Sequence, residues 1–148
     1  NMKFKTIAGR TVYGGGGIMP DIFIPVDTTK VSDFYNEVWD KNILYRYTLE
    51  FADNNRSKLD GVKSIEELDK VLAESELMTE FLKYAERGGV TPTKEDLHKS
   101  QEVIMTQIRA YIGRNALSDE SGYYYNIYPI DDVMQRAVKE LKHGGLKL

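Results

Sequence analysis

The chain has 148 residues, of which 41% are hydrophobic, and this is enough for one domain whose core needs neither a metal nor a disulfide. Its 20 basic and 23 acidic residues are interspersed and leave a formal net charge of −3, so the sequence offers no basic face for a nucleic acid. Cysteine is absent, which excludes thiol catalysis, disulfides and thiolate metal sites.

The N-terminal part of the chain has a β pattern. Residues 3–13 predict two short strands around the turn-forming pair Ala8-Gly9. Residues 22–26 predict a further short strand after the turn at Pro20-Asp21. No apolar run approaches the length that spans a membrane.

Four consecutive glycines follow the second predicted strand, in the stretch GRTVYGGGGIMPDIFIP, residues 9–25. Glycine lets backbone N–H groups converge on an anion, so a phosphate-binding loop is the first alternative to test. A P-loop requires a lysine followed by serine or threonine, and a dinucleotide fingerprint requires a third small residue that opens a helix. The stretch has neither, so we predict that the glycines shape the backbone.

Beyond residue 27 the apolar spacing becomes helical. Ser32 is the predicted N-cap of a helix that restarts near Leu44 and stops at Asn54-Asn55. Ser64 and Glu67 have the spacing of a capping box at the start of the next helix. The residues expected on the apolar side of these segments are Phe34, Tyr35, Val38, Trp39, Leu44, Tyr47, Leu49, Phe51, Ile65, Leu68, Val71 and Leu72.

Three further helices complete a predicted bundle of about five. The first lies within residues 75–87 and stops at Gly88-Gly89, and the last begins after a cap at Asp131. The helix from Thr93 to Asn115 has the longest regular apolar face, so we expect it at the centre of the fold. The predicted apolar positions are Leu77, Met78, Phe81, Leu82, Ala85, Leu97, Ile104, Ile108, Tyr111, Ile112, Val133, Met134, Ala137, Val138 and Leu141. The predicted fold class is therefore mainly α, with a small β unit of a hairpin or short strands at the N-terminus.

Residues 118–131 predict a loop that contains a short extended aromatic piece. Its tyrosines, Tyr123, Tyr124, Tyr125 and Tyr128, have two interpretations. They stack on a sugar or a base, or they pack half-buried against a neighbouring helix. We favour packing, because a half-buried tyrosine ring is the commoner use of such residues.

No residue pattern identifies a catalytic, cofactor or metal site. His98 and His143 lie far apart and have no spaced carboxylate or histidine partner, so we interpret both as surface residues. The carboxylates at residues 66–67 and at Glu74 and Glu76 are typical of solvated helix faces. We therefore predict no cofactor and no metal.

The stretch TIAGRTVYGGGGIMPDIFIPVD, residues 6–27, resembles a segment found late in the C-terminal processing peptidases, the tail-specific serine peptidases related to the tricorn core. Its expanded glycine run is similar to that of members from Bacteroidetes-type bacteria. The helical tail of those members is similar at Phe51-Ala52 and at residues 108–114, 122–131 and 135–141, so the resemblance covers nearly the whole chain. The residues that match the family motif are Gly9, Arg10, Tyr13, Gly14, Gly15, Gly16, Gly17, Ile18, Pro20, Asp21 and Ile22.

The family's catalytic serine and lysine precede this motif and stand in small-residue and glycine-rich contexts, which do not occur here. Ser32 with Lys58, and Ser75 with Lys99, have a similar separation but lie in polar helical sequence. Ser100 follows Lys99 directly on a helix, which sends the two side chains in different directions. The resemblance thus implies a chain that contains no catalytic residues.

The resemblance also implies an organisation and a function. Residues 1–28 are the β segment that ends a peptidase core, and residues 29–148 are a helical C-terminal domain. Asn1 precedes Met2, so we expect a piece of a longer periplasmic or cell-envelope enzyme that cleaves polypeptide substrates through a lysine-activated serine. We expect a structural role for this part, with oligomerisation through the N-terminal strands or the helical tail. The alternatives are a stand-alone helical interaction module without enzymatic activity, and a glycine loop whose N–H groups bind an extended peptide.

Overall fold

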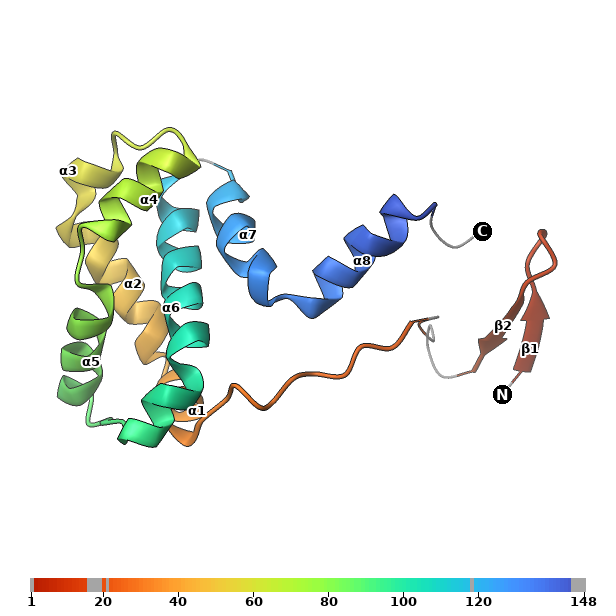
Figure 1. The fold of residues 1–148 in the computed structure, drawn as a ribbon, viewed down its shortest axis with the longest axis horizontal. Coiled ribbons are helices and arrows are strands. Elements are labelled where there is room, and N and C mark those ends of the chain that lie inside the picture. The colour runs from red at the N-terminus through yellow and green to blue at the C-terminus, as the bar shows by residue number, and fades with distance from the viewer. Residues whose placement is uncertain (1, 16–19, 21, 118, 145–148) are drawn as a thin grey trace. The chain divides into compact units, whose positions relative to one another are not determined.

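The computed structural model describes residues 2–15, 20, 22–117 and 119–144. The chain divides into two compact units, one of residues 27–131 and one that combines residues 1–26 with residues 132–148. The described residues form eight α-helices, one short 3-10 helix and one two-stranded antiparallel sheet (Figure 1). The predicted fold class, mainly α with a small N-terminal β unit, is confirmed.

More helices are present than the five or so predicted. One predicted segment divides into two helices, and two further helices form where turns or a loop were expected. In chain order the elements are β1 (Met2–Lys5), β2 (Thr11–Gly14), α1 (Asp33–Asp40), α2 (Ile43–Asn54), α3 (Arg56–Leu59), α4 (Ile65–Ala73), α5 (Leu77–Arg87), α6 (Lys94–Ala116), α7 (Ser121–Ile127), η1 (Tyr128–Ile130) and α8 (Asp132–Lys142).

Helices α1 and α2 are separated by a sharp change of direction at Asn42. Ser32 caps α1 as predicted, because its hydroxyl accepts a hydrogen bond of 3.2 Å from the backbone N–H of Tyr35. Asn42 has φ of 55°, a left-handed conformation that asparagine tolerates better than most residues, and α2 starts at the next residue. Two predicted apolar positions, Trp39 on α1 and Leu49 on α2, are exposed. The buried side of α1 runs through the residues at 34 and 38, and that of α2 through those at 43, 44, 47, 48 and 51.

Helix α6 runs through the middle of the larger unit, with α7 on one side and α2 and α5 on the other (Figure 1). The hydroxyl of Thr93 accepts a bond of 3.1 Å from the N–H of Asp96, and the carboxylate of Asp96 accepts one of 2.9 Å from the N–H of Thr93. The Thr93 hydroxyl also donates to the carboxylate of Asp96 at 2.7 Å, and this bond, followed by the one from the Thr93 N–H, holds the pKa of Asp96 below its usual value. Ile104, Ile108 and Ile112 are fully buried, so the predicted central position of this helix is correct.

Helices α6 and α7 meet backbone to backbone at two glycines. A Cβ added to Gly113 would lie 2.6 Å from the carbonyl oxygen of Gly122, and a Cβ added to Gly122 would lie 2.6 Å from that of Gly113. Real Cβ atoms essentially never come so close to another heavy atom. The tight seating of α7 against α6 therefore depends on the absence of a side chain at both positions.

Two predictions for extended structure were wrong. The described residues of the predicted strand at 22–26 form no strand, and Phe23 and Val26 are exposed. Pro25 has no N–H to donate, and no described strand lies beside this segment to pair with it. The predicted extended tyrosine piece is helix α7 followed by η1, because packing against α6 at Gly122 overrides the β preference of tyrosine.

Helix α8 belongs to the smaller unit and forms where it was predicted. Its residues at 133, 134, 137, 138 and 141 repeat with helical spacing, but none of them is buried, and Val133 and Leu141 are largely exposed. None of the described helices has both the length and the apolar character needed to cross a bilayer.

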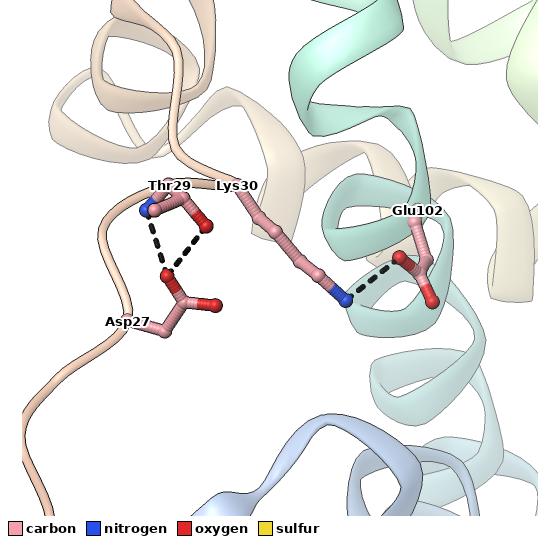
Figure 2. Close-up of polar contacts among 4 residues, drawn as sticks. All are labelled: Asp27, Thr29, Lys30 and Glu102. Carbon is pink, nitrogen blue, oxygen red and sulfur yellow. Dashed lines mark hydrogen bonds and ion pairs between the residues drawn. The ribbon is translucent and has the colours of Figure 1, made fainter.

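The larger unit begins at a short polar turn (Figure 2). One carboxylate oxygen of Asp27 accepts bonds from the hydroxyl of Thr29 at 2.6 Å and from its backbone N–H at 2.9 Å, and these lower the pKa of Asp27. The ammonium of Lys30 then lies 3.0 Å from the carboxylate of Glu102 on α6. Both members of this ion pair are exposed, so the pair contributes little to stability, but it links the start of the unit to its central helix.

Candidate functional site

The first part of the glycine motif closes the hairpin of β1 and β2. Gly9 has φ of 81° in the turn, where its N–H donates to the carbonyl of Thr6 at 2.8 Å. The N–H of Arg10 donates to the hydroxyl of Thr6 at 3.1 Å, and the N–H of Thr6 donates to the carbonyl of Arg10 at 2.9 Å. The conformational freedom of glycine is therefore used at Gly9 to turn the chain.

In the later part of the motif, the backbone at Gly14 lies close to the ring of Phe4. A Cβ on Gly14 would lie 2.9 Å from the ring of Phe4, and Gly15 has φ of 106°. Tyr13 lies in β2 with the ammonium of Lys3 5.7 Å from its ring centroid, and Pro20 is exposed. The remaining motif residues, Gly16, Gly17, Ile18 and Asp21, lie outside the described residues.

The hairpin has one apolar and one polar face. The register pairs Phe4 with Val12 and Lys3 with Tyr13, so alternate positions put Met2, Phe4 and Val12 on one face. Met2 is 63% exposed and Phe4 is 51% exposed. An isolated two-stranded hairpin is marginally stable, and here its apolar face is largely uncovered.

The serine candidates are engaged in structural hydrogen bonds. The hydroxyls of Ser32 and Ser100 are 2.7 Å apart, and the residues are 3% and 0% exposed. Ser100 uses its only hydroxyl proton to donate to the carbonyl of Asp96 at 2.8 Å, so the shared bond is donated by Ser32. A continuous chain of hydrogen bonds thus runs from the N–H of Tyr35 through both serines to α6.

The lysines considered with these serines do not take part in that chain. Lys99 is exposed and lines a surface pocket of about 370 Å³ with Ser32, while Lys58 is exposed on α3. Ser75 donates its hydroxyl proton to the carbonyl of Val71 at 2.9 Å. The structure brings together Ser32 and Ser100, a pair that the sequence did not indicate.

We predict that Ser100→Ala lowers the free energy of unfolding by about 1–3 kcal/mol, because the buried hydroxyl of Ser32 loses its acceptor. Ser32→Ala should have a similar effect through the lost cap and the lost bond. The double variant should cost less than the sum of the two, since both remove one hydrogen-bond chain. Urea unfolding measures all three, with the exposed Ser57→Ala as the control, and strict additivity would contradict the shared bond.

A larger groove of about 550 Å³ lies between α2 and α5. Its buried residue Tyr47 donates its hydroxyl proton to the carbonyl of Leu77 at 3.1 Å, and burial raises the pKa of that hydroxyl. The exposed rim carries both charges, and Arg87 lies 3.7 Å from Glu50. The buried hydroxyl of this groove and the Arg87–Glu50 pair on its rim are therefore already engaged with other groups of the fold.

An aromatic pocket of about 340 Å³ lies where α1, α2 and α6 meet. Buried Val38 and Leu44 form its aliphatic part. The remaining lining residues are Trp39, Asn42, Tyr45, Tyr111 and Arg114. The rings of Tyr45 and Tyr111 are 5.3 Å apart at an interplanar angle of 75°, and Trp39, the only tryptophan of the chain, is 47% exposed.

One wall of the pocket is supported by α7. The guanidinium of Arg114 lies 4.0 Å from the ring centroid of Tyr123 and 2.9 Å from the carboxylate of Glu120. The rings of Tyr111 and Tyr123 are 5.8 Å apart. Tyr123 therefore packs half-buried against α6, as predicted for these tyrosines, whereas the side chains of Tyr124, Tyr125 and Tyr128 are exposed.

The polar groups of the pocket are mostly unused. Within the described residues, no hydrogen bond is made by the indole N–H of Trp39, by the carboxamide of Asn42 or by the hydroxyls of Tyr45 and Tyr111. Burial raises the pKa of the Tyr111 hydroxyl further above neutral pH, so this hydroxyl is protonated and can donate. The pocket therefore combines aromatic surface with free hydrogen-bond donors, which is the chemistry of a binding site.

The sequence did not predict this pocket. Tyr45 and Tyr47 are two residues apart on one helix, and only the fold decides that Tyr45 is exposed and Tyr47 buried. The one available signal was the single tryptophan, which was assigned to the core. Both histidines are exposed, and the described residues contain no group of three His, Asp or Glu side chains arranged for a metal.

The comparisons with known proteins give one match. A model of a family of unknown function (DUF8443) matches residues 34–118, which is more than half of the chain. The matched segment contains all the residues of the aromatic pocket and excludes the hairpin with its glycine motif. No curated protein and no solved structure gives a significant match. The chain therefore belongs to this family, whose function is unknown.

Proposed function

We propose that the chain is the non-catalytic C-terminal part of a peptidase that cleaves peptide bonds with a lysine-activated serine. In this proposal residues 1–28 complete the peptidase core and residues 29–148 form its helical tail. The catalytic serine and lysine, and the polypeptide substrates, belong to the parent enzyme in the periplasm or cell envelope. The resemblance of residues 6–27 to the late segment of the C-terminal processing peptidases supports this function.

The observation that carries the proposal is the uncovered apolar face of the hairpin. Phe4 is half exposed beside Val12 on a two-stranded sheet whose outer edges have no partner among the described strands. Strand edges and apolar faces of this kind are normally paired or covered. A role in completing a larger sheet accounts for both the unpaired strand edges and the uncovered apolar face. Pairing of these edges between two copies of the chain would form a homo-oligomer.

The experiment compares this chain with the longer polypeptide that the proposal requires, using an unfolded protein as substrate. We expect turnover by the longer polypeptide alone, because acyl transfer requires a nucleophile, a base and an oxyanion site together. Phe4→Asp should lower that turnover by about tenfold or more by breaking the sheet contact. Lys5→Asp, on the polar face, is the matched control.

Two results would overturn the peptidase proposal. One is turnover by this chain alone that either Ser32→Ala or Ser100→Ala abolishes. The other is a longer polypeptide in which Phe4→Asp and Lys5→Asp are equally active.

The second candidate function is a helical interaction module without enzymatic activity. The aromatic pocket favours it, because Trp, Tyr and Arg are the residue types that dominate binding energy at protein interfaces. Its test is the fluorescence of Trp39 during titration with reduced and carboxymethylated ribonuclease A, an unfolded polypeptide that contains no tryptophan. A module that binds polypeptides through this pocket gives a saturating change in emission, and an unchanged spectrum rejects it.

A further inference from the structure

The lining of the aromatic pocket restricts what it can bind. Its unused polar groups are an indole N–H, which only donates, two phenol hydroxyls, which donate and accept, and one carboxamide with two N–H donors and one acceptor oxygen. None of the seven lining residues carries a carboxylate, and the nearby Glu120 is already paired with Arg114. The pocket is therefore suited to a ligand that presents acceptors and an apolar surface.

A sugar fits this description less well than an extended peptide. Sugar hydroxyls donate as well as accept, and the strongest acceptor for them is a carboxylate, which no lining residue provides. A polyproline II segment has no internal hydrogen bonds, so its carbonyl oxygens are available as acceptors. Its proline rings are apolar and pack on aromatic faces such as those of Tyr45 and Tyr111, which are nearly perpendicular to each other.

The charge beside the pocket adds a second requirement. Arg46 donates to the carbonyl of Asn42 at 3.4 Å and to that of Lys41 at 3.3 Å. Within the described residues it pairs with no carboxylate, whereas Lys41 pairs with Glu37 and Arg114 with Glu120. One uncompensated cation thus lies next to a lining residue, where an acidic group on the ligand would neutralise it.

From these observations we infer that the aromatic pocket of α1, α2 and α6 binds an extended, proline-containing polypeptide with an acidic residue beside the proline. The inference rests on the proposal that residues 27–131 act as an interaction module. Trp39, Tyr45 and Tyr111 form the docking surface for the proline, and Arg46 selects the flanking charge. A preformed polyproline II conformation reduces the entropy lost on binding.

The test uses the intact chain and the emission of Trp39, which is its only tryptophan. The probe is the peptide acetyl-Asp-Pro-Pro-Leu-Pro-Pro-Asp-amide, which contains no tryptophan. We expect a saturating blue shift as the peptide removes water from the indole. Replacing all prolines of the peptide by alanine, or both of its aspartates by lysine, should each weaken binding by about tenfold or more.

Variants of the protein locate the site. Tyr45→Ala should weaken binding by about tenfold or more, whereas Tyr125→Ala, an exposed tyrosine outside the pocket, should leave it unchanged. Arg46→Glu should weaken binding of the acidic peptide and improve binding of the lysine peptide. Arg46 is exposed, so we expect its charge reversal to leave the fold intact. This variant therefore tests the site even if Tyr45→Ala alters folding.

The outcomes separate the two levels of the proposal. If an unfolded polypeptide shifts the emission of Trp39 but the proline and alanine peptides bind with equal affinity, the inferred ligand is wrong. The interaction module itself is then still supported. No response to any polypeptide would reject the module itself. Saturation by chitotriose with no response to peptides would show a carbohydrate site and would also overturn the inference.

Discussion

Ile108→Asp is expected to lower the free energy of unfolding of the helical unit by about 3 kcal/mol or more. Ile108 is 0% exposed on α6, and Ile104 and Ile112 on either side of it along the same face are equally buried. An ionised aspartate there loses its hydration, and a protonated one still leaves polar atoms among aliphatic side chains. Either form is costly, so the helix that the whole unit packs around is weakened.

The pH dependence of this variant identifies the cause. Burial raises the pKa of the new carboxyl above its value in the unfolded chain, so the folded state binds the proton more tightly. The stability lost at pH 7 should therefore be partly regained as the pH falls through that raised pKa. Ile108→Asn, which does not titrate, should show no such recovery.

Urea unfolding followed by circular dichroism measures both variants. Gln101→Asp is the control, because Gln101 is exposed on the same helix and surface changes usually stay within about 0.5 kcal/mol. A urea-unfolding curve that is the same for Ile108→Asp and for the unchanged chain would contradict the placement of α6 at the centre of the fold.

Helix α6 was predictable because its signals are local. The start of the helix at Thr93 is read from the sequence, and the structure adds a capping box in which Thr93 and Asp96 exchange two hydrogen bonds. The apolar period through Ile104, Ile108 and Ile112 then gives the buried face. The cap at Ser32 was correct for the same reason, since capping depends on the residues next to the helix start.

The errors occurred where contacts between distant segments decide the structure. Tyrosines favour strands, and only the packing of Gly122 on Gly113 explains why residues 121–127 form a helix. Residues 22–26 have the composition of a strand but have no partner strand among the described elements. A β-strand forms only where another strand pairs with it, so composition alone predicts more strands than the structure contains.

The aromatic pocket was not predictable for a related reason. Its lining comes from positions 38–45 and 111–114, which the fold of α1, α2 and α6 brings together. The sequence shows a tyrosine at 45 and another at 47 with equal chemistry. Tyr47 is buried because its side of α2 faces α5, whereas Tyr45 lies at the exposed edge beside Tyr111 of α6. The buried bond between Ser32 and Ser100 joins residues 68 positions apart and had no local signal.

Gly113→Ala is expected to destabilise the helical unit by about 3 kcal/mol, although alanine is the better helix former. In an exposed helix interior this substitution gains about 1 kcal/mol from helix propensity. Here the new Cβ would lie 2.6 Å from the carbonyl oxygen of Gly122 and 2.8 Å from its carbonyl carbon. These are backbone atoms that cannot rotate away, so α7 must move outward by about 1 Å. The cost of this overpacking is larger than the stability gained from the higher helix propensity of alanine.

The displacement should be visible in α7 and in the aromatic pocket. Tyr123 supports Arg114 and Tyr111, so hydrogen exchange of the α7 amides should accelerate and the emission of Trp39 should change. Gly61→Ala is the matched control, because an added Cβ at Gly61 has no heavy atom within 4 Å. If Gly113→Ala instead raised the free energy of unfolding, as helix propensity alone predicts, α7 would not pack on α6 at these glycines. Tyr123 of α7 would then not support the wall of the aromatic pocket.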